Sequence, residues 1–359
     1  MNDETNIRND GSLSTQKPKK SLSEKISESR LLITEPIEKP QTVLSINESD
    51  FQSVLCTLGN ISLIQGQAKS RKSFLMSFVV TALITGKYLK FTGSMPEEKR
   101  KILFFDTEQG LFHSKKVQER IYRLSGLSVD AEFQFLEFYN LRPYNYKERI
   151  EIINHLILSK NDVGFVIIDG IRDLVKDIND AGEATNITGL LMKWSDQKEI
   201  HIMNVLHENK GDRNSRGHVG SELQNKSESV IRVSREPDRK DFSRVEPVFL
   251  RDRDFEEFLF SISNEGDPEL VEKFSKRTYC KPAEMDTELH QAWVREVFTR
   301  DPGPLSQNQY ITLLKAISSE YEIKLGDNAL RDWVTYHFDN GLIANQGTTK
   351  NFKIISCLT

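Results

Sequence analysis

From Ile61 onward, short apolar runs alternate with longer stretches whose apolar residues recur at helical spacing, as in residues 72–86. Parallel strands need a helical crossover between them, so a chain with this alternation folds into a mainly parallel sheet with helices on both faces. We therefore predict an α/β fold with a mainly parallel twisted sheet. The expected strands are residues 61–64, 101–106, 133–138, 164–169 and 201–207, the expected helices are 72–86, 145–159 and 181–197, and residues 229–234, 245–250 and 255–262 are expected to extend the sheet as an antiparallel edge.

The rest of the chain divides into a tail, a linker and a second domain. Residues 1–40 are polar and almost without apolar periodicity, which predicts a disordered tail before an α/β domain over 41–262. Residues 263–285 contain Gly266, Pro268 and Pro282 without a clear period, which predicts a linker. The C-terminal domain is then expected over residues 286–359.

Residues 286–359 show the pattern of three helices followed by a hairpin, an order that resembles a winged helix. Such domains often bind DNA, but this segment has seven Lys and Arg against nine Asp and Glu. Its third helix carries Arg331 between Asp327 and Asp332, where a helix that reads DNA needs cationic or amide side chains. Contact with DNA and contact with protein both stay open.

Composition restricts the class of protein. The three cysteines, Cys56, Cys280 and Cys357, form no CxxC or Cys/His cluster, which argues against a zinc site or a disulfide framework. No apolar run has the length of a membrane helix, and the N-terminal residues lack the pattern of a signal peptide, so no membrane contact and a cytoplasmic location are expected. The net charge of -4 means that any contact with nucleic acid must come from a local patch.

A phosphate-binding motif lies between the first expected strand and the first expected helix. It matches the Walker A pattern GxxxxGK[ST] except that Arg71 stands in place of the second glycine. Backbone N–H groups and a helix N-terminus bind phosphates in such loops. Lys72 is predicted to contact the β- and γ-phosphates of ATP, and Ser73 to bind Mg²⁺. The whole predicted nucleotide-binding set is Gly66, Gln67, Ala68, Lys69, Ser70, Arg71, Lys72 and Ser73.

Two acidic residues follow later strands. Glu108 lies two residues after the strand 101–106, where its carboxylate is predicted to activate the water that attacks the γ-phosphate. Asp169 ends an apolar strand and is predicted to hold Mg²⁺ as a Walker B carboxylate. Carboxylates at strand ends are common, but their order after a phosphate loop is distinctive.

This order of motifs over residues 55–262 resembles the RecA-like ATPases, in particular the hexameric replicative helicases of the RepA-like branch. The resemblance implies a RecA-like fold, ATP and Mg²⁺ as cofactors, and a homo-oligomeric ring. It also implies that Glu108 is the catalytic base and Asp169 the Walker B residue. Arg71 departs from the family pattern, and this departure leaves the rate of ATP turnover open.

The segment after the fifth strand supplies the remaining candidates. The resemblance assigns His207, the polar residue that ends this strand, as a sensor of the γ-phosphate. It also gives the following loop to single-stranded DNA or to an arginine finger inserted into the next subunit. Ser215-Arg216-Gly217 resembles the finger segment, so Arg216 is the finger candidate, with Lys210 and Arg213 as DNA phosphate contacts. A solvated surface loop is the alternative.

Three functions fit these features. The first is an ATP-hydrolysing DNA motor or helicase in the replication of a mobile element. The second is a RecA-like ATPase that regulates DNA or protein binding without unwinding. The third is a degenerate P-loop protein that binds partners with little turnover, as Arg71 suggests. A small-molecule kinase fits less well, because no Arg-rich lid segment stands out.

Overall fold

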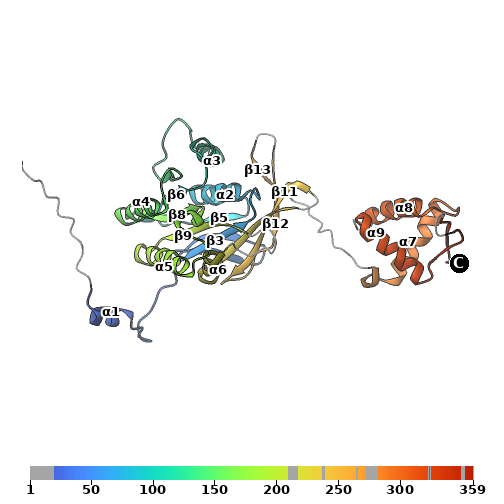
Figure 1. Cartoon of the computed structure of the whole chain (residues 1–359), viewed down its shortest axis with the longest axis horizontal. Helices are drawn as coiled ribbons and strands as arrows, with labels where there is room; N and C mark the ends of the chain where they lie inside the picture. Colours follow the sequence, from blue (N-terminus) through green and yellow to red (C-terminus); the bar gives the residue numbers. More distant parts are fainter. Residues whose placement is uncertain are drawn as a thin grey trace, which may run out of the picture. The chain divides into compact units, whose positions relative to one another are not determined.

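A computed structural model describes residues 20–208, 217–236, 239–263, 266–271, 282–321, 323, 325–348 and 352–358. The chain forms two compact units, Met1–Glu269 and Leu270–Thr359 (Figure 1). Within the described residues, none of the helices is both long enough and apolar enough to cross a membrane.

The first unit is built on a nine-stranded sheet in the order β13-β12-β11-β10-β3-β9-β8-β6-β7. The strands from β10 to β7 run parallel, and β11 and β12 run antiparallel at the other side. The predicted α/β fold with a mainly parallel sheet is confirmed. The strands are β3 (Ile61–Gly66), β6 (Lys101–Asp106), β7 (Leu136–Asn140), β8 (Val163–Asp169), β9 (His201–His207), β10 (Ser229–Glu236), β11 (Arg239–Leu250), β12 (Phe258–Ile262) and β13 (Pro268–Leu270).

One detail of the expected edge is wrong. The segment 229–234 was expected in the antiparallel edge, but β10 pairs in parallel with β3. A helix between β9 and β10 provides the crossover that a parallel pair requires. Sequence periodicity does not reveal this helix, α6 (Gly217–Lys226), which follows a Gly-rich segment.

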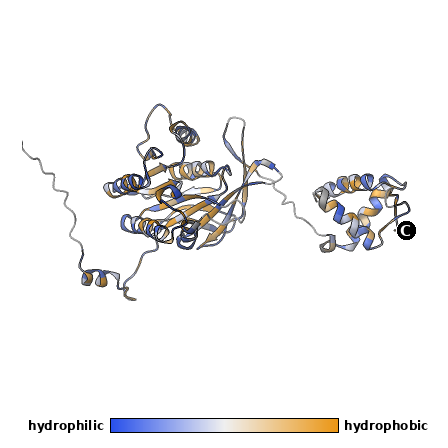
Figure 2. Cartoon of the chain, in the orientation of Figure 1, coloured by the Kyte–Doolittle hydropathy of each residue, from blue (hydrophilic) through white to orange (hydrophobic). Residues whose placement is uncertain are grey.

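Helices cover both faces of the sheet. One core joins α4, α5 and α6 to the sheet through residues such as Ile153, Leu191 and Leu223. On the other face α2 packs against α3. Hydrophobic residues colour the sheet strands in Figure 2, as expected for strands covered on both faces. The helices are α2 (Lys72–Thr85), α3 (Leu111–Leu124), α4 (Tyr146–Ser159) and α5 (Ala181–Lys198), with the 3₁₀ turns η1 (Glu97–Lys99) and η2 (Ile171–Leu174).

A second, four-stranded sheet was not predicted. Its strands lie in the order β2-β1-β5-β4, and β4 and β5 pack on α2. Because β4 and β5 of this sheet pack on α2 in addition to α3 and the main sheet, every residue from Leu75 to Leu83 is buried, and not only one face. A helix that is apolar all round is one that is covered all round. The strands are β1 (Thr42–Asn47), β2 (Gln52–Thr57), β4 (Lys87–Tyr88) and β5 (Phe91–Gly93).

The segments expected to lack structure contain short elements. Within the polar tail, α1 (Leu22–Ser29) begins at a capping box formed by Ser21 and Glu24, and none of its residues is buried. Within the segment expected as a linker, β13 joins the edge of the main sheet and η3 (Pro282–Glu284) precedes the next helix. The structured part of the first unit thus extends past residue 262.

The second unit consists of α7 (Thr287–Arg300), α8 (Gln307–Glu320), α9 (Asp327–Asp339) and a hairpin of β14 (Ile343–Asn345) and β15 (Ile354–Ser356). This is the expected order of three helices and a hairpin. Trp293 and Trp333 stack at a centroid distance of 4.8 Å in its core. They are core residues, as burial of both at 0% exposure shows.

Candidate functional site

The carboxyl ends of four neighbouring strands meet at one edge of the main sheet. Gly66 at the end of β3 pairs with His207 at the end of β9, and Asp106 at the end of β6 pairs with Asp169 at the end of β8. In open parallel sheets this edge is where ligands bind. The sequence motifs, although far apart in the chain, therefore converge in space.

The phosphate loop turns sharply between β3 and α2. Arg71 is the N-cap of α2 and has the left-handed conformation, with φ of 77° and ψ of 30°. Since a Cβ disfavours this conformation, the glycine of the Walker pattern would fit here without strain, and Arg71 does not. At the start of the loop, a Cβ on residue 66 would clash with the carbonyl oxygen of Val233, which accounts for Gly66.

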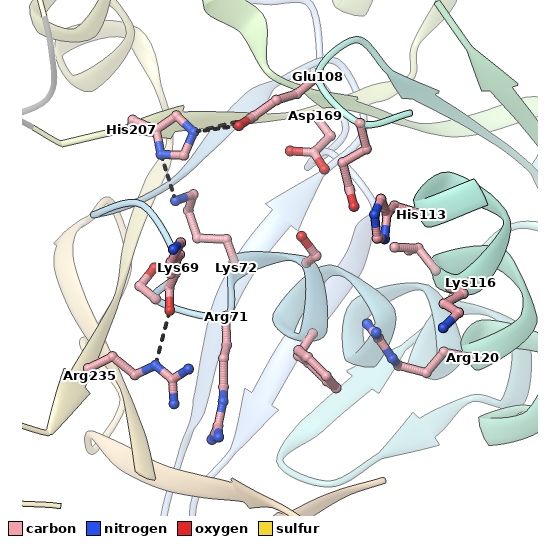
Figure 3. A pocket seen from close by; sticks show the side chains of 15 residues that line it. Lys69, Arg71, Lys72, Glu108, His113, Lys116, Arg120, Asp169, His207 and Arg235 are labelled. Atoms are coloured by element: carbon pink, nitrogen blue, oxygen red, sulfur yellow. Dashed lines mark hydrogen bonds and ion pairs between the residues drawn. The ribbon is translucent and has the colours of Figure 1, made fainter. Parts of the chain in front are cut away.

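The side chain of Arg71 points away from Lys72 (Figure 3). Its Nη1 donates to the carbonyl oxygen of Asp241 in β11 at 2.5 Å. Two further hydrogen bonds join the same loop and hairpin: Arg235 Nε donates to Lys69 O at 3.0 Å, and Ser243 Oγ donates to Ser70 O at 3.3 Å. The β10–β11 hairpin thus holds the outer side of the phosphate loop.

Lys72 is buried at the centre of the site. Its ammonium donates to Gly66 O at 2.8 Å, to Gln67 O at 2.9 Å and to His207 Nδ1 at 3.1 Å. An ammonium has three protons, so these three acceptors use all of them. Burial lowers the pKa of Lys72, while the nearby carboxylates, led by Asp169, oppose that shift.

His207 lies between Lys72 and Glu108. Its Nε2 is 3.1 Å from Glu108 Oε2, and its Nδ1 accepts from Lys72. A neutral imidazole with its proton on Nε2 satisfies both contacts. The hydrogen bond from His207 lowers the pKa of Glu108 below its ordinary value, so this carboxyl is ionised at neutral pH. Figure 3 shows the three side chains in this order.

Asp169 is buried beside a second carboxylate, Asp106. Burial, with the charges of Asp106 and Glu108, raises the pKa of Asp169 to about 8. Asp106 orders the turn that carries Glu108: its Oδ1 accepts from the backbone N–H of Glu108 at 3.1 Å, and its Oδ2 accepts from Ser114 Oγ at 2.7 Å. From the sequence, Asp106 was noted only as the end of a strand. In the structure its hydrogen bonds position the turn that carries Glu108.

A cavity of about 550 Å³ opens at this edge of the sheet. In Figure 3, Glu108, Asp169 and His207 lie at one end of it, and Arg71, Arg235 and Arg120 lie at the other. Of the predicted loop residues, Gly66, Gln67 and Ala68 do not line the cavity, although the first two hold Lys72 by their carbonyl groups. The lining residues are Lys69, Ser70, Arg71, Lys72, Ser73, Phe74, Glu108, Gln109, His113, Lys116, Val117, Arg120, Asp169, His207 and Arg235.

A buried polar cluster behind the loop was not predicted from the sequence. Glu208, next to His207, accepts from Gln65 Nε2 at 2.9 Å and from Arg232 Nε at 2.6 Å. Its own N–H donates to Gly66 O at 3.2 Å. Glu208 thereby fixes the chain directly after His207. A charged residue beside the polar end of an apolar strand was the available signal.

The face of α3 that lines the cavity was not predicted from the sequence either. His113, Lys116 and Arg120 recur at helical spacing after the turn that carries Glu108. That spacing was visible in the sequence, but which face of the helix meets the cavity depends on tertiary packing. Lys210, Arg213 and Arg216, the predicted DNA contacts and finger, lie outside the described residues.

The donor set fits a nucleoside triphosphate with Mg²⁺. The hydroxyl of Ser70 is buried and has no hydrogen-bond partner in the described part of the chain, so a polar ligand group at the loop would satisfy it. Among the described residues no group of three or more His, Cys, Asp or Glu could hold a metal unaided. Mg²⁺ typically uses one or two carboxylates with substrate phosphates, which matches Asp169 and Ser73, two residues that line the same cavity.

No protein-family model and no curated protein matches the sequence. Among solved structures, the chain is similar to the RadB recombinase at 14% identity, with a TM-score of 0.44, over 60% of this chain and 92% of that chain. The activity of this chain has therefore to be inferred from its own site.

Proposed function

We propose that this chain is a RecA-like ATPase that hydrolyses ATP by in-line attack of water on the γ-phosphate. The arrangement of Lys72, His207 and Glu108 at the carboxyl edge of the sheet carries this proposal. Hydrogen bonds connect Lys72, a cation suited to phosphates, through the His207 ring to the ionised carboxylate of Glu108. If this contact only stabilised the fold, it would not need to lie beside a phosphate-binding loop.

Lys72 would bind the β- and γ-phosphates together with the N–H groups at the start of α2. To bind the Lys72 ammonium, a γ-phosphate oxygen must replace at least one of its three present acceptors. Of these acceptors, His207 Nδ1 is the one outside the phosphate loop. Release of His207 would then change its contact with Glu108. In this proposal His207 would sense the γ-phosphate, and Glu108 would accept a proton from the attacking water.

Mg²⁺ would be held by the Ser73 hydroxyl and by Asp169. The ion supplies charge neutralisation for the phosphates. Asp169 has a pKa raised to about 8 by burial, so a bound cation would favour its ionised form and displace a proton. Metal affinity should accordingly rise with pH.

We further propose that the ATPase drives movement on single-stranded DNA within a homo-oligomeric ring, as in the RepA-like helicases. Arg216 would be a finger for the neighbouring subunit, and Lys210 and Arg213 would contact DNA phosphates. The location of these residues directly after His207 and Glu208 in the sequence supports a link to the nucleotide. The C-terminal unit would be a winged-helix-like module.

ATP turnover with and without single-stranded DNA tests these proposals, with Lys72→Ala as the inactive variant and Lys87→Ala on β4 as its control. Turnover that DNA stimulates and that Lys72→Ala abolishes supports the motor. Turnover that DNA does not change supports a regulatory ATPase. Tight ATP binding without turnover supports the degenerate partner-binding protein, a function that the strained Arg71 favours.

Subunit mixing tests the finger. Arg216→Ala and Lys72→Ala subunits are each inactive alone if the finger acts between subunits. A mixture should recover part of the turnover, because some interfaces then combine an intact Lys72 with an intact Arg216. A mixture without recovery contradicts a finger supplied by the neighbouring subunit.

A further inference from the structure

Two exposed aromatic side chains lie at the carboxyl edge of the main sheet, outside the nucleotide cavity. Phe112, in the first turn of α3, is 66% exposed, and Tyr144, in the loop between β7 and α4, is 45% exposed. Neither of them lines the cavity. Leu111, beside Phe112, is 74% exposed. Large apolar side chains that gather on one exposed surface mark a contact site.

The two segments that carry these rings lie side by side. Asn140 Nδ2, at the end of β7, donates to Gln109 O at 2.8 Å and to Ser114 Oγ at 2.6 Å. The guanidinium of Arg142 lies against Gly110, where an added Cβ would be 2.9 Å from its Nη1. The start of α3 and the loop after β7 therefore form one continuous surface.

Cationic side chains accompany the aromatic rings on this surface. Lys116 Nζ lies 4.6 Å from the ring centroid of Phe112, and the His113 ring lies 5.5 Å from the same ring. Lys115, Lys116 and Arg142 form no ion pair with a carboxylate in the part of the chain that the structure describes. An exposed aromatic face beside such cations suits a partner that is both flat and anionic.

We infer that the start of α3 and the loop after β7 form a second contact surface for single-stranded DNA. Phe112 and Tyr144 stack on its bases. Lys115 and Arg142 bind its phosphates. Sites for single strands combine these two features, aromatic rings for the bases and cations for the backbone. The inference rests on single-stranded DNA as the proposed partner of this chain and adds the place where its bases are held.

The loop proposed above as the DNA contact lacks the aromatic part of such a site. Residues 208–224 contain cations but no Phe, Tyr or Trp, so this segment can bind phosphates without stacking on a base. Because β6, β7, β8 and β9 run parallel, that loop and the aromatic surface both follow carboxyl ends of strands at one edge of the sheet. The two surfaces supply complementary parts of one binding path.

A second copy of this chain is the other occupant that an exposed aromatic surface can have. A symmetric dimer through this surface would bring its cations against the same cations of the other copy, which is unfavourable. A polyanion has the opposite effect, since it neutralises them. The charge of the surface therefore favours nucleic acid.

Fluorescence anisotropy of a labelled oligothymidylate, titrated with the whole chain, tests the stacking. Phe112→Leu and Tyr144→Leu keep an apolar side chain but lose the aromatic face, so each should weaken DNA binding by about tenfold. The control is Phe249→Leu in β11, which is 58% exposed and pairs with Val230 near the start of β10, at the other end of the sheet. Wild-type affinity for DNA in both Phe112→Leu and Tyr144→Leu overturns the inference.

The salt dependence of binding tests the phosphate contacts. The double variant Lys115→Gln with Arg142→Gln should lower the slope of log affinity against log salt concentration by about 1.4, because each contact with a single strand contributes about 0.7. Lys193→Gln, on the exposed side of α5, should leave the slope unchanged. An unchanged slope in the double variant contradicts the phosphate contacts.

Two further outcomes separate this surface from the other proposals. If the wild-type chain does not bind the oligothymidylate, the proposed DNA partner and this inference both fall, while ATP turnover still tests the ATPase. If Lys210→Gln with Arg213→Gln abolishes binding and Phe112→Leu does not weaken it, this surface alone is excluded. A lower oligomer mass of Phe112→Leu in light scattering without DNA would make the surface a contact between subunits, which also overturns the inference.

Discussion

The ammonium of Lys72 lies 3.1 Å from Nδ1 of His207, and the other ring nitrogen of His207 faces Glu108. One imidazole therefore joins the cation expected to bind phosphate to the carboxylate expected to activate water. Any movement of Lys72 toward a phosphate changes what His207 can offer Glu108. The three residues should act as a unit and not additively.

His207→Ala should lower kcat for ATP by about a hundredfold, a typical loss for one positioned polar group at a reacting phosphate. ATP affinity should change little, because the loop and Lys72 remain. Steady-state turnover and nucleotide titration measure the two effects. His155→Ala, an exposed histidine in α4, is the control. Normal turnover in His207→Ala would remove His207 from the mechanism.

Glu108→Gln should reduce turnover by at least about a hundredfold while ATP binding is retained, because glutamine keeps the shape but cannot accept a proton. The pKa of Glu108 is lowered by His207, so this residue adds no loss of activity between pH 5 and pH 7. Glu119→Gln on the exposed side of α3 serves as the control. Single-turnover hydrolysis is the measurement, and unimpaired hydrolysis would exclude Glu108 as the base.

The sequence predicts the site best where short motifs meet strand ends. Lys72, Glu108 and Asp169 were assigned from local pattern and His207 from the family resemblance, and the structure brings all four to one cavity. Parallel strands make this possible, since their carboxyl ends share one edge. The chemical roles of the four residues remain predictions.

The sequence does not predict what depends on contacts between distant segments. The burial of α2 on all sides requires the sheet of β1 and β5, whose strands are short and interrupted by polar turns. The stacking of Arg120 on Phe74 joins two residues that are 46 positions apart in the chain and belong to different helices. Neither hydrophobic periodicity nor motif spacing carries information on such pairs.

Asp169 should make stability fall as pH rises. Its pKa is raised from 3.8 to about 8 by burial and by Asp106, so the folded protein binds one more proton than the unfolded chain between these values. The free energy of unfolding should therefore decline from pH 5 to pH 8. Asp169→Asn should remove this contribution and be more stable than wild type at pH 8 by at least about 1 kcal/mol.

Urea denaturation at pH 6 and pH 8 measures this effect, with Asp196→Asn in α5 as an exposed control. The same Asp169→Asn protein should lose the stimulation of turnover by Mg²⁺, because an amide is a poor ligand for this ion. An unchanged pH dependence of stability in Asp169→Asn would show that Asp169 is ionised in the fold.

The C-terminal unit should be sensitive to acid through two buried histidines. Tyr310 Oη, His337 and His290 form a chain of hydrogen bonds of 2.9 Å each that ends at the carbonyl of Pro282. All donors and acceptors are satisfied when both rings are neutral. Burial, followed by the charge of His290, lowers the pKa of His337 to about 3. The stabilisation from these hydrogen bonds is fully present above pH 6.5, the ordinary pKa of histidine, and is lost as the pH falls from 6.5 toward 3.

Tryptophan fluorescence can follow this unit in the whole protein. Trp293 and Trp333 belong to it, and Trp194→Phe removes the remaining tryptophan from the first unit. We expect the urea midpoint of the fluorescence change to drop between pH 7 and pH 5. His337→Gln in the same background should be less stable at pH 7 and show a smaller drop. An equal drop in both proteins would place the acid sensitivity elsewhere.

Arg71 offers a test of strain in the phosphate loop. Its left-handed conformation disfavours any residue with a Cβ, and its side chain holds the β10–β11 hairpin through Asp241. Arg71→Ala keeps the strain and loses the hydrogen bond, whereas Arg71→Gly loses both. Arg71→Gly should therefore be more stable than Arg71→Ala by about 1 kcal/mol. Thermal unfolding of the two proteins measures the difference. If Arg71→Ala is the more stable of the two, the loop does not require the left-handed conformation at this position.

Because glycine matches the Walker pattern, we expect Arg71→Gly to retain ATP turnover. A turnover faster than that of the wild type would show that Arg71 slows the enzyme by holding the loop to the hairpin.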